Sequence, residues 1–180
     1  MMNKAVFLDR DGVINEMKTN RVRFVNRPDQ FYFLKGAPEA IKALSQSGFL
    51  LFVVTNQGGV GLGYLSHDEL ESIHDYMVNE IKQAGGFIQE VSCCTHKPHA
   101  GCSCRKPEPG MLLELAEKYR IDLAGSFMIG DRDVDIEAGN KAGCTTILLN
   151  DNSSPSYNAD YIFPDLLSAS TFILNTKDSF

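Results

Sequence analysis

The strongest constraint on the fold is an alternation along the chain, in which short apolar runs take turns with stretches of helical periodicity. Strands are expected at 5–8, 49–54, 87–93, 126–129 and 144–149, and helices at 38–47, 66–84, 109–120, up to Ala142 and at 166–174. Short runs without polar alternation are typical of strands that are buried on both faces. Strands that alternate with helices favour parallel pairing. The sequence therefore predicts an α/β fold with a doubly wound, Rossmann-like parallel sheet of about five strands.

Length and composition limit the classes of protein to consider. The 180 residues are 43% hydrophobic and show no repeat or linker, so we expect one domain over 1–180 with a sizeable core. A net charge of −6 argues against general nucleic-acid binding. The sequence contains no apolar run of about 18 residues and the first residues lack a signal-peptide core. We therefore expect no membrane partner, a cytoplasmic location and a monomer.

The first expected strand ends in two acidic residues. Asp9 and Asp11 are separated by Arg10 and followed by Gly12. While the chain stays extended, the two carboxylates share a face, and they repel each other unless a cation or a proton lies between them. Mg²⁺ is the simplest such cation. The alternative is a strand that runs into a charged turn, and the downstream sequence decides between the two.

Polar groups also stand beside the second and fourth expected strands. Parallel strands bring their carboxyl ends to one edge of the sheet, so these groups should meet the Asp pair. Carboxylates suit Mg²⁺, whereas Arg and Lys suit phosphate oxygens. An Asp can attack phosphorus while a second carboxyl transfers protons. The groups beyond Asp9 and Asp11 are Thr55, Asn56, Gln57, Arg105, Lys106, Asp131 and Asp135.

A cysteine-rich loop at 93–105 precedes the expected helix at 109–120. One His and three Cys in this loop make a tetrahedral zinc set, namely Cys94, His96, Cys102 and Cys104. Cys93 and His99 are rival ligands. Four protein ligands leave no open position, so the zinc would be structural and would orient Arg105 and Lys106. The alternative is a set of reduced cysteines without metal.

A polar, basic segment at 16–33 follows the Asp pair. It contains Lys18, Arg21, Arg23 and Arg27. Long loops in compact domains are usually functional or disordered. Two interpretations stay open at this stage, a flap that helps to hold an anion and a solvated face. A second polar loop is expected at 150–159.

The ordered set Asp9-x-Asp11, Thr55, Lys106 and Gly130-Asp131-x-x-x-Asp135 resembles the four motifs of the haloacid dehalogenase (HAD) superfamily of phosphohydrolases. The resemblance implies that Asp9 is the nucleophile and Asp11 the general acid/base. It further implies that Thr55 binds the transferring phosphoryl group and that Lys106 stabilises its charge. The Mg²⁺ ligands would be Asp9, the backbone carbonyl of Asp11, and Asp131, with Asp135 in support.

DRDGVIN, TNQGGVG, the C-x-H…C-x-C loop and CRKPEPGMLLE together resemble the D,D-heptose 1,7-bisphosphate phosphatases and, less closely, the histidinol-phosphatases. Both groups are small HAD members without a large cap domain. The resemblance implies a Mg²⁺-dependent phosphomonoesterase that removes the C7 phosphate of D-glycero-D-manno-heptose 1,7-bisphosphate through an aspartyl-phosphate. Such a reaction belongs to carbohydrate metabolism, on the route to the heptose of lipopolysaccharide. The substrate contacts would be Arg10, Thr55, Asn56, Gln57, Arg105 and Lys106.

Other functions stay open on the sequence. Histidinol phosphate or another small phosphorylated metabolite would use the same machinery. The segment EMKTNRVRFVNRP replaces a shorter Gly-Tyr segment of the heptose enzymes, and it lies where the sugar should be recognised. A non-catalytic receiver or interaction module would also use Asp9 as a phosphoacceptor, but it would not need the second carboxylate of Asp11.

Overall fold

The computed structural model describes residues 2–150 and 156–176. Its centre is one parallel sheet of six strands in the order β3-β2-β1-β4-β5-β6. The strands are β1 (Ala5–Leu8), β2 (Leu50–Asn56), β3 (Glu90–Cys94), β4 (Phe127–Gly130), β5 (Thr145–Leu149) and β6 (Tyr161–Phe163). The expected fold class is confirmed, with one strand more than predicted. β6 has only three residues, Tyr161–Phe163, and is too short to be recognised as a strand from its apolar character.

The five expected helices are present, and two short elements were not predicted. The helices are α1 (Ala37–Gln46), α2 (Gly58–Gly61), α3 (His67–Gln83), α4 (Gly110–Tyr119), α5 (Asp133–Ala142) and α6 (Leu166–Thr176), with a 3-10 helix η1 (Pro28–Gln30). α2 and η1 are too short to show an apolar period. Residues 151–155 of the polar loop expected at 150–159 lie outside the described residues.

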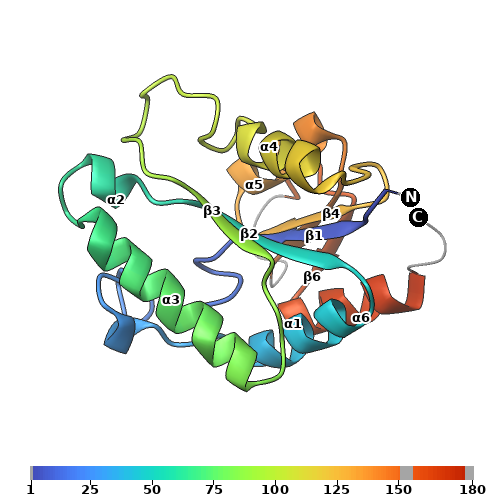
Figure 1. Cartoon of the computed structure of the whole chain (residues 1–180), viewed down its shortest axis with the longest axis horizontal. Helices are drawn as coiled ribbons and strands as arrows, with labels where there is room; N and C mark the ends of the chain where they lie inside the picture. Colours follow the sequence, from blue (N-terminus) through green and yellow to red (C-terminus); the bar gives the residue numbers. More distant parts are fainter. Residues whose placement is uncertain (1, 151–155, 177–180) are drawn as a thin grey trace.

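The helices cover both faces of the sheet (Figure 1). α1, α3 and α6 share one core with Val6 and Leu8 of β1. α4 packs on the other face, where Ala5 and Phe7 point, and Phe7 stacks on Phe52 with ring centroids 5.5 Å apart. Alternate residues of a strand point to opposite faces of the sheet. Because helices cover both faces, all four residues of β1 are buried. This double burial explains the unbroken apolar run in the sequence.

The position of β1 decides where the functional groups gather. β1 lies between β2 and β4, with Leu8 paired to Val53 and to Ile129. The backbone N–H of Asp9 donates to the carbonyl of Ile129 at 3.0 Å, so the register continues one residue past the strand. The carboxyl ends of β1, β2 and β4 therefore meet at the middle of one edge, as expected for a ligand crevice.

Most segments between the helices and strands are short. The longer described ones, 9–27 and 95–109, flank the functional edge, and neither is large enough to form a cap domain of its own. In the described parts of the chain, no helix combines the length and apolar character needed to cross a membrane.

Candidate active site

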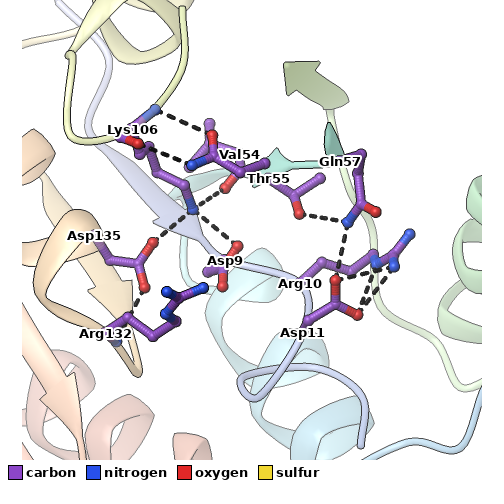
Figure 2. Close-up of polar contacts among 10 residues, drawn as sticks. Asp9, Arg10, Asp11, Val54, Thr55, Gln57, Lys106, Arg132 and Asp135 are labelled. Carbon is purple, nitrogen blue, oxygen red and sulfur yellow. Dashed lines mark hydrogen bonds and ion pairs between the residues drawn. The ribbon is translucent and has the colours of Figure 1, made fainter. Parts of the chain in front are cut away.

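A buried lysine joins the ends of three elements. The ammonium of Lys106 lies 2.8 Å from Asp9 Oδ1 and 2.6 Å from Asp135 Oδ1, and it donates to the Val54 carbonyl at 2.7 Å (Figure 2). The ammonium thus makes two hydrogen bonds, to Asp9 and to the Val54 carbonyl, and an additional ion pair with Asp135. Lys106 is 2% exposed, and Asp135 is buried as well. Strand β1, strand β2 and helix α5 are thus linked through one positive charge.

The carboxylates around this lysine are electrostatically crowded. Burial lowers the pKa of Lys106, but the charges of Asp9 and Asp135 outweigh it and raise that pKa, so the lysine stays charged. Burial and the charge of Asp135 raise the pKa of Asp9 to about 7, although Lys106 opposes the shift. The same two causes raise the pKa of Asp131 to about 6. One ammonium does not neutralise three carboxylates.

The crowding fits a cation site. Carboxylate oxygens of Asp9, Asp131 and Asp135 lie within 4.8 Å of one another. Asp131 Oδ1 is buried without a hydrogen-bond partner, which is costly unless an ion satisfies it. A side chain at Gly12 would place its Cβ 2.2 Å from Asp131 Oδ2, so only glycine allows this approach. Hard oxygen ligands of this kind suit Mg²⁺.

Asp11 has a different environment from Asp9. Its carboxylate faces Arg10, whose Nη2 lies 2.9 Å from Oδ1 and 3.0 Å from Oδ2 (Figure 2). Asn15 and Gln57 each donate a further hydrogen bond at 2.9 Å. Burial raises the pKa of Asp11, but the charge of Arg10 and these hydrogen bonds outweigh it and lower that pKa. The surroundings of Asp9 and Asp11 therefore shift the pKa values of these two acids in opposite directions.

Three residues predicted as substrate contacts hold other functional groups in the structure. Asn56 clamps the backbone of Lys106: its Nδ2 donates to the carbonyl at 2.9 Å and its Oδ1 accepts from the N–H at 3.0 Å. Gln57 Nε2 bridges Asp11 Oδ2 and Thr55 Oγ1, both at 2.9 Å. Arg10 faces Asp11. A direct contact of these three side chains with substrate stays a prediction.

Sequence reasoning missed two buried polar residues. Asn15 supports Asp11 and also donates to the Glu16 carbonyl at 3.0 Å. Its place in DRDGVIN was the available signal. His74 lies in the apolar stripe of α3, with Nε2 at 3.1 Å from Arg10 Nη1. Burial and the charge of Arg10 lower the pKa of His74 to about 4, so its imidazole is neutral at physiological pH.

A cavity of about 610 Å³ opens above these groups. Asp9, Asp11, Thr55 and Lys106 line it, and its other walls include the apolar side chains of Met17, Phe24, Leu62 and Tyr64. Such a mixture of an apolar wall and convergent polar groups is typical of small-molecule sites.

The basic segment 16–33 contributes unevenly to this cavity. Lys18 lines it. Arg21 instead pairs with Glu16 and stacks on the ring of Tyr32 at 3.9 Å. Arg27 forms an exposed pair with Asp29. Lys18 is therefore placed where a flap could reach a ligand, whereas Arg27 belongs to a solvated face. That the segment holds an anion stays a prediction.

The cysteine loop brings together the four expected zinc ligands. Cys94 Sγ lies 3.5 Å from His96 Nδ1 and 3.7 Å from Cys102 Sγ, and Cys104 Sγ lies 3.3 Å from His96 Nδ1. A tetrahedral zinc with bonds of about 2.0–2.3 Å would separate its ligand atoms by about 3.5–3.8 Å. Within the described residues, the rivals Cys93 and His99 are outside this group. The donor set therefore suits a structural zinc ion.

The loop is anchored next to the cavity. Arg105 Nη1 donates to the carbonyl of His96 at 3.3 Å. A Cβ on Gly61 would lie 2.5 Å from the backbone N of Lys97, so helix α2 and the loop are in direct contact. This hydrogen bond ties Arg105 to the loop that carries the zinc ligands. Its role as a substrate contact stays a prediction.

Comparisons with known proteins agree with this geometry. A HAD-hydrolase-like family model matches residues 103–169. The D-glycero-beta-D-manno-heptose-1,7-bisphosphate 7-phosphatase of Bordetella bronchiseptica is 39% identical over 146 residues, which are 81% of this chain and 80% of that protein. The protein of the same name from Pseudomonas aeruginosa is 33% identical over 180 residues, covering 97% of this chain and 99% of the relative.

The structural comparison gives the same result. The crystal structure of D,D-heptose 1,7-bisphosphate phosphatase from B. bronchiseptica, complexed with magnesium and phosphate, is 34% identical. It superposes with a TM-score of 0.84 and covers 96% of this chain and 98% of its own. The chain therefore belongs to the D-glycero-D-manno-heptose 1,7-bisphosphate 7-phosphatase family of HAD-like hydrolases.

Proposed function

We propose that this protein is a Mg²⁺-dependent phosphatase that removes the 7-phosphate of D-glycero-β-D-manno-heptose 1,7-bisphosphate. The observation that carries the proposal is the arrangement of Asp9, Lys106 and Asp135 beside the unpaired oxygen of Asp131, at the base of a 610 Å³ cavity. Relatives that share most of the chain bear the name of this activity, and the two reported above act on the β anomer.

The first half of the reaction uses Asp9 as nucleophile. A carboxylate oxygen of Asp9 attacks phosphorus, the bond between phosphorus and the sugar oxygen breaks, and an aspartyl-phosphate forms. Lys106 fixes the attacking group through the 2.8 Å ion pair and offsets charge on the phosphoryl oxygens. Asp11 would give a proton to the leaving sugar oxygen. Because Arg10 lowers the pKa of Asp11, only the small protonated fraction of this group can take this step. Thr55 binds the phosphoryl group.

The second half regenerates the enzyme. Asp11, now ionised, accepts a proton from water as the water attacks the aspartyl-phosphate, and phosphate leaves. Asp9, the Asp11 backbone carbonyl and Asp131 would hold Mg²⁺, which supplies charge neutralisation for the phosphoryl oxygens when it is bound. Its binding would also satisfy the buried oxygen of Asp131.

The surroundings of the cavity support a substrate with two phosphates. Lys18 and Arg132 line the main cavity. A second cavity of about 340 Å³ adjoins it, shares Asn56, Lys106 and Arg132, and includes Arg105. Lys18, Arg105 and Arg132 supply positive charge in these cavities besides Lys106, and we expect them to pair with the phosphate that is not removed. Histidinol phosphate has one phosphate and leaves such a role empty.

A substrate panel tests the proposal. We would measure kcat/KM on both heptose bisphosphate anomers and on histidinol phosphate, with Mg²⁺ and with EDTA. We expect the β anomer to be preferred over histidinol phosphate by at least about tenfold, because kcat/KM ratios report differential transition-state binding. EDTA should abolish turnover. Preference for histidinol phosphate would overturn the substrate, and a stable phospho-Asp9 without turnover would favour the receiver alternative. A cytoplasmic location and a monomeric state remain predictions.

A further inference from the structure

We infer that His74 is a positioning residue, which holds the guanidinium of Arg10 so that Arg10 holds the carboxyl group of Asp11. The three side chains form a chain of contacts from helix α3 to the end of strand β1. This inference rests on the proposed function, because it assigns a task to the acid/base of that reaction.

The side chain of Arg10 is isolated from solvent. It is 1% exposed, so water does not fix its orientation. Within residues 2–150 and 156–176, its hydrogen-bonding partners are Asp11 and His74. Nε and Nη2 face the carboxylate, and Nη1 faces the imidazole. A planar guanidinium held at two edges cannot rotate without losing one of them.

The imidazole of His74 accepts a hydrogen bond from Arg10. A guanidinium has N–H donors and no acceptor. At 3.1 Å from Arg10 Nη1, His74 Nε2 must therefore present its lone pair, with the proton on Nδ1. A protonated imidazole would place two donors against each other. His74 thus serves as a neutral acceptor for a buried cation.

Helix α3, which carries His74, is held rigidly in place. α3 begins with a capping box, in which Ser66 Oγ accepts from the Glu69 N–H and the Glu69 carboxylate accepts from the Ser66 N–H. Ile73 and Met77 anchor the same face of the helix in the core. His74 lies in that anchored face and is 9% exposed, so its position is set by core packing.

Through His74 and Arg10, helix α3 therefore holds the carboxyl group of Asp11 in position. If His74 cannot accept, Nη1 of Arg10 loses its hydrogen bond in a buried place, and the guanidinium is free to turn away from Asp11. Misplacement of a catalytic group by about 1 Å can cost up to about 10²-fold in rate. Asp11 keeps Asn15 and Gln57 as donors, so we expect a smaller loss, of about tenfold.

Three variants test the inference through kcat/KM on the best alkyl phosphate of the substrate panel. His74→Leu removes the acceptor and should lower kcat/KM about tenfold. His74→Gln places an amide oxygen near the position of Nε2 and should restore most of the activity. Ile73→Ala is the matched control, because it destabilises the same helix face without touching Arg10. It should lower the melting temperature and leave kcat/KM within about twofold.

Two further measurements separate positioning from general damage. Asp11 protonates the leaving oxygen, so His74→Leu should change kcat/KM on p-nitrophenyl phosphate, whose leaving group needs little protonation, by less than about twofold. In an Asp11→Asn background, His74→Leu should cause no further loss, since residues that act through one another are not additive. Equal losses on both substrates, or in both backgrounds, would overturn the inference. If the protein did not hydrolyse heptose bisphosphate but hydrolysed another alkyl phosphate, the proposed substrate would be wrong. The effects of the Asp11 and His74 variants could still be measured with that other substrate.

Discussion

The strand-end centre and the zinc loop support the same cavity by different physical means. Asp9, Lys106 and Asp135 are buried. The sheet register fixes the backbone of Asp9, helix α5 carries Asp135, and two hydrogen bonds from Asn56 hold the backbone of Lys106. In the loop 95–105, by contrast, His96 is exposed and Cys102 and Cys104 are only partly buried. Packing orders the first region. The second has little apolar surface to bury, so a zinc ion bound by its four ligands would order it.

The two regions meet at one residue. The ammonium of Lys106 belongs to the strand-end centre, whereas its backbone directly follows the zinc loop and is clamped by Asn56. Loss of packing and loss of metal should therefore have separable effects.

Asp9→Asn should break the strand-end centre chemically and spare its structure. We expect kcat to fall by at least about 10³-fold, because a nucleophile has no substitute. The fold should persist, since removal of one of three crowded carboxylates relieves repulsion. Steady-state kinetics and thermal melting measure the two effects. Asp133→Asn, an exposed change on α5, is the control, and robust turnover by Asp9→Asn would refute the nucleophile assignment.

Cys104→Ser should break the loop and spare the sheet. Purified protein should carry about one zinc per chain, and the variant should lose it together with about 10–100-fold in kcat/KM. Metal analysis and limited proteolysis within 95–105 measure the change. Cys93→Ser is the matched control, because Cys93 lies outside the ligand group. An intact loop and full activity without zinc would remove the contrast between the two regions.

Asn56→Ala tests the link between the regions. The substitution removes both hydrogen bonds to the Lys106 backbone. We expect kcat to fall about tenfold with zinc content unchanged, because the ammonium loses its precise placement. Asn79→Ala, exposed on α3, is the control. A rise in KM without a change in kcat would instead support the sequence-based role of Asn56 as a substrate contact.

Mg²⁺ should stabilise the protein more at pH 8 than at pH 5. The pKa values of Asp9 (about 7) and Asp131 (about 6) are raised above their ordinary value. The stability that they contribute is therefore present at low pH and is lost as pH rises through these values. At pH 8 both are ionised, and Mg²⁺ offsets their repulsion; at pH 5 it competes with protons.

Melting temperatures with and without Mg²⁺ measure this difference. At about 100 times its dissociation constant, Mg²⁺ should raise the melting temperature by about 5–10 °C at pH 8. The pKa of His74 is lowered from 6.5 to about 4. The stability that its neutral imidazole contributes to the protein is therefore lost as pH falls from 6.5 toward 4. That contribution is present with and without Mg²⁺ and cancels. Asp131→Asn is the control, and equal gains at both pH values would contradict the prediction.

Much of the architecture could be read from local pattern. Unbroken apolar runs marked the central strands because β1 and its neighbours are covered on both faces. The edge strand β6 and the short helix α2 were missed because neither buries enough apolar surface to leave a pattern. The zinc ligands Cys94, His96, Cys102 and Cys104 could be proposed because all four come from one short segment.

The sequence was sufficient to identify the chemical groups of the site and to place them at one edge of the sheet, because side-chain alternation follows from local periodicity and parallel strands bring their carboxyl ends to the same edge. The order of the strands came from the tertiary structure. The tertiary structure alone decided how those groups pair. It placed Asn56 on Lys106 and His74 on Arg10, and it gave Asp9 and Asp11 opposite pKa shifts. Such pairings join residues 50 or more positions apart. Their energies depend on burial and distance, which no local pattern encodes.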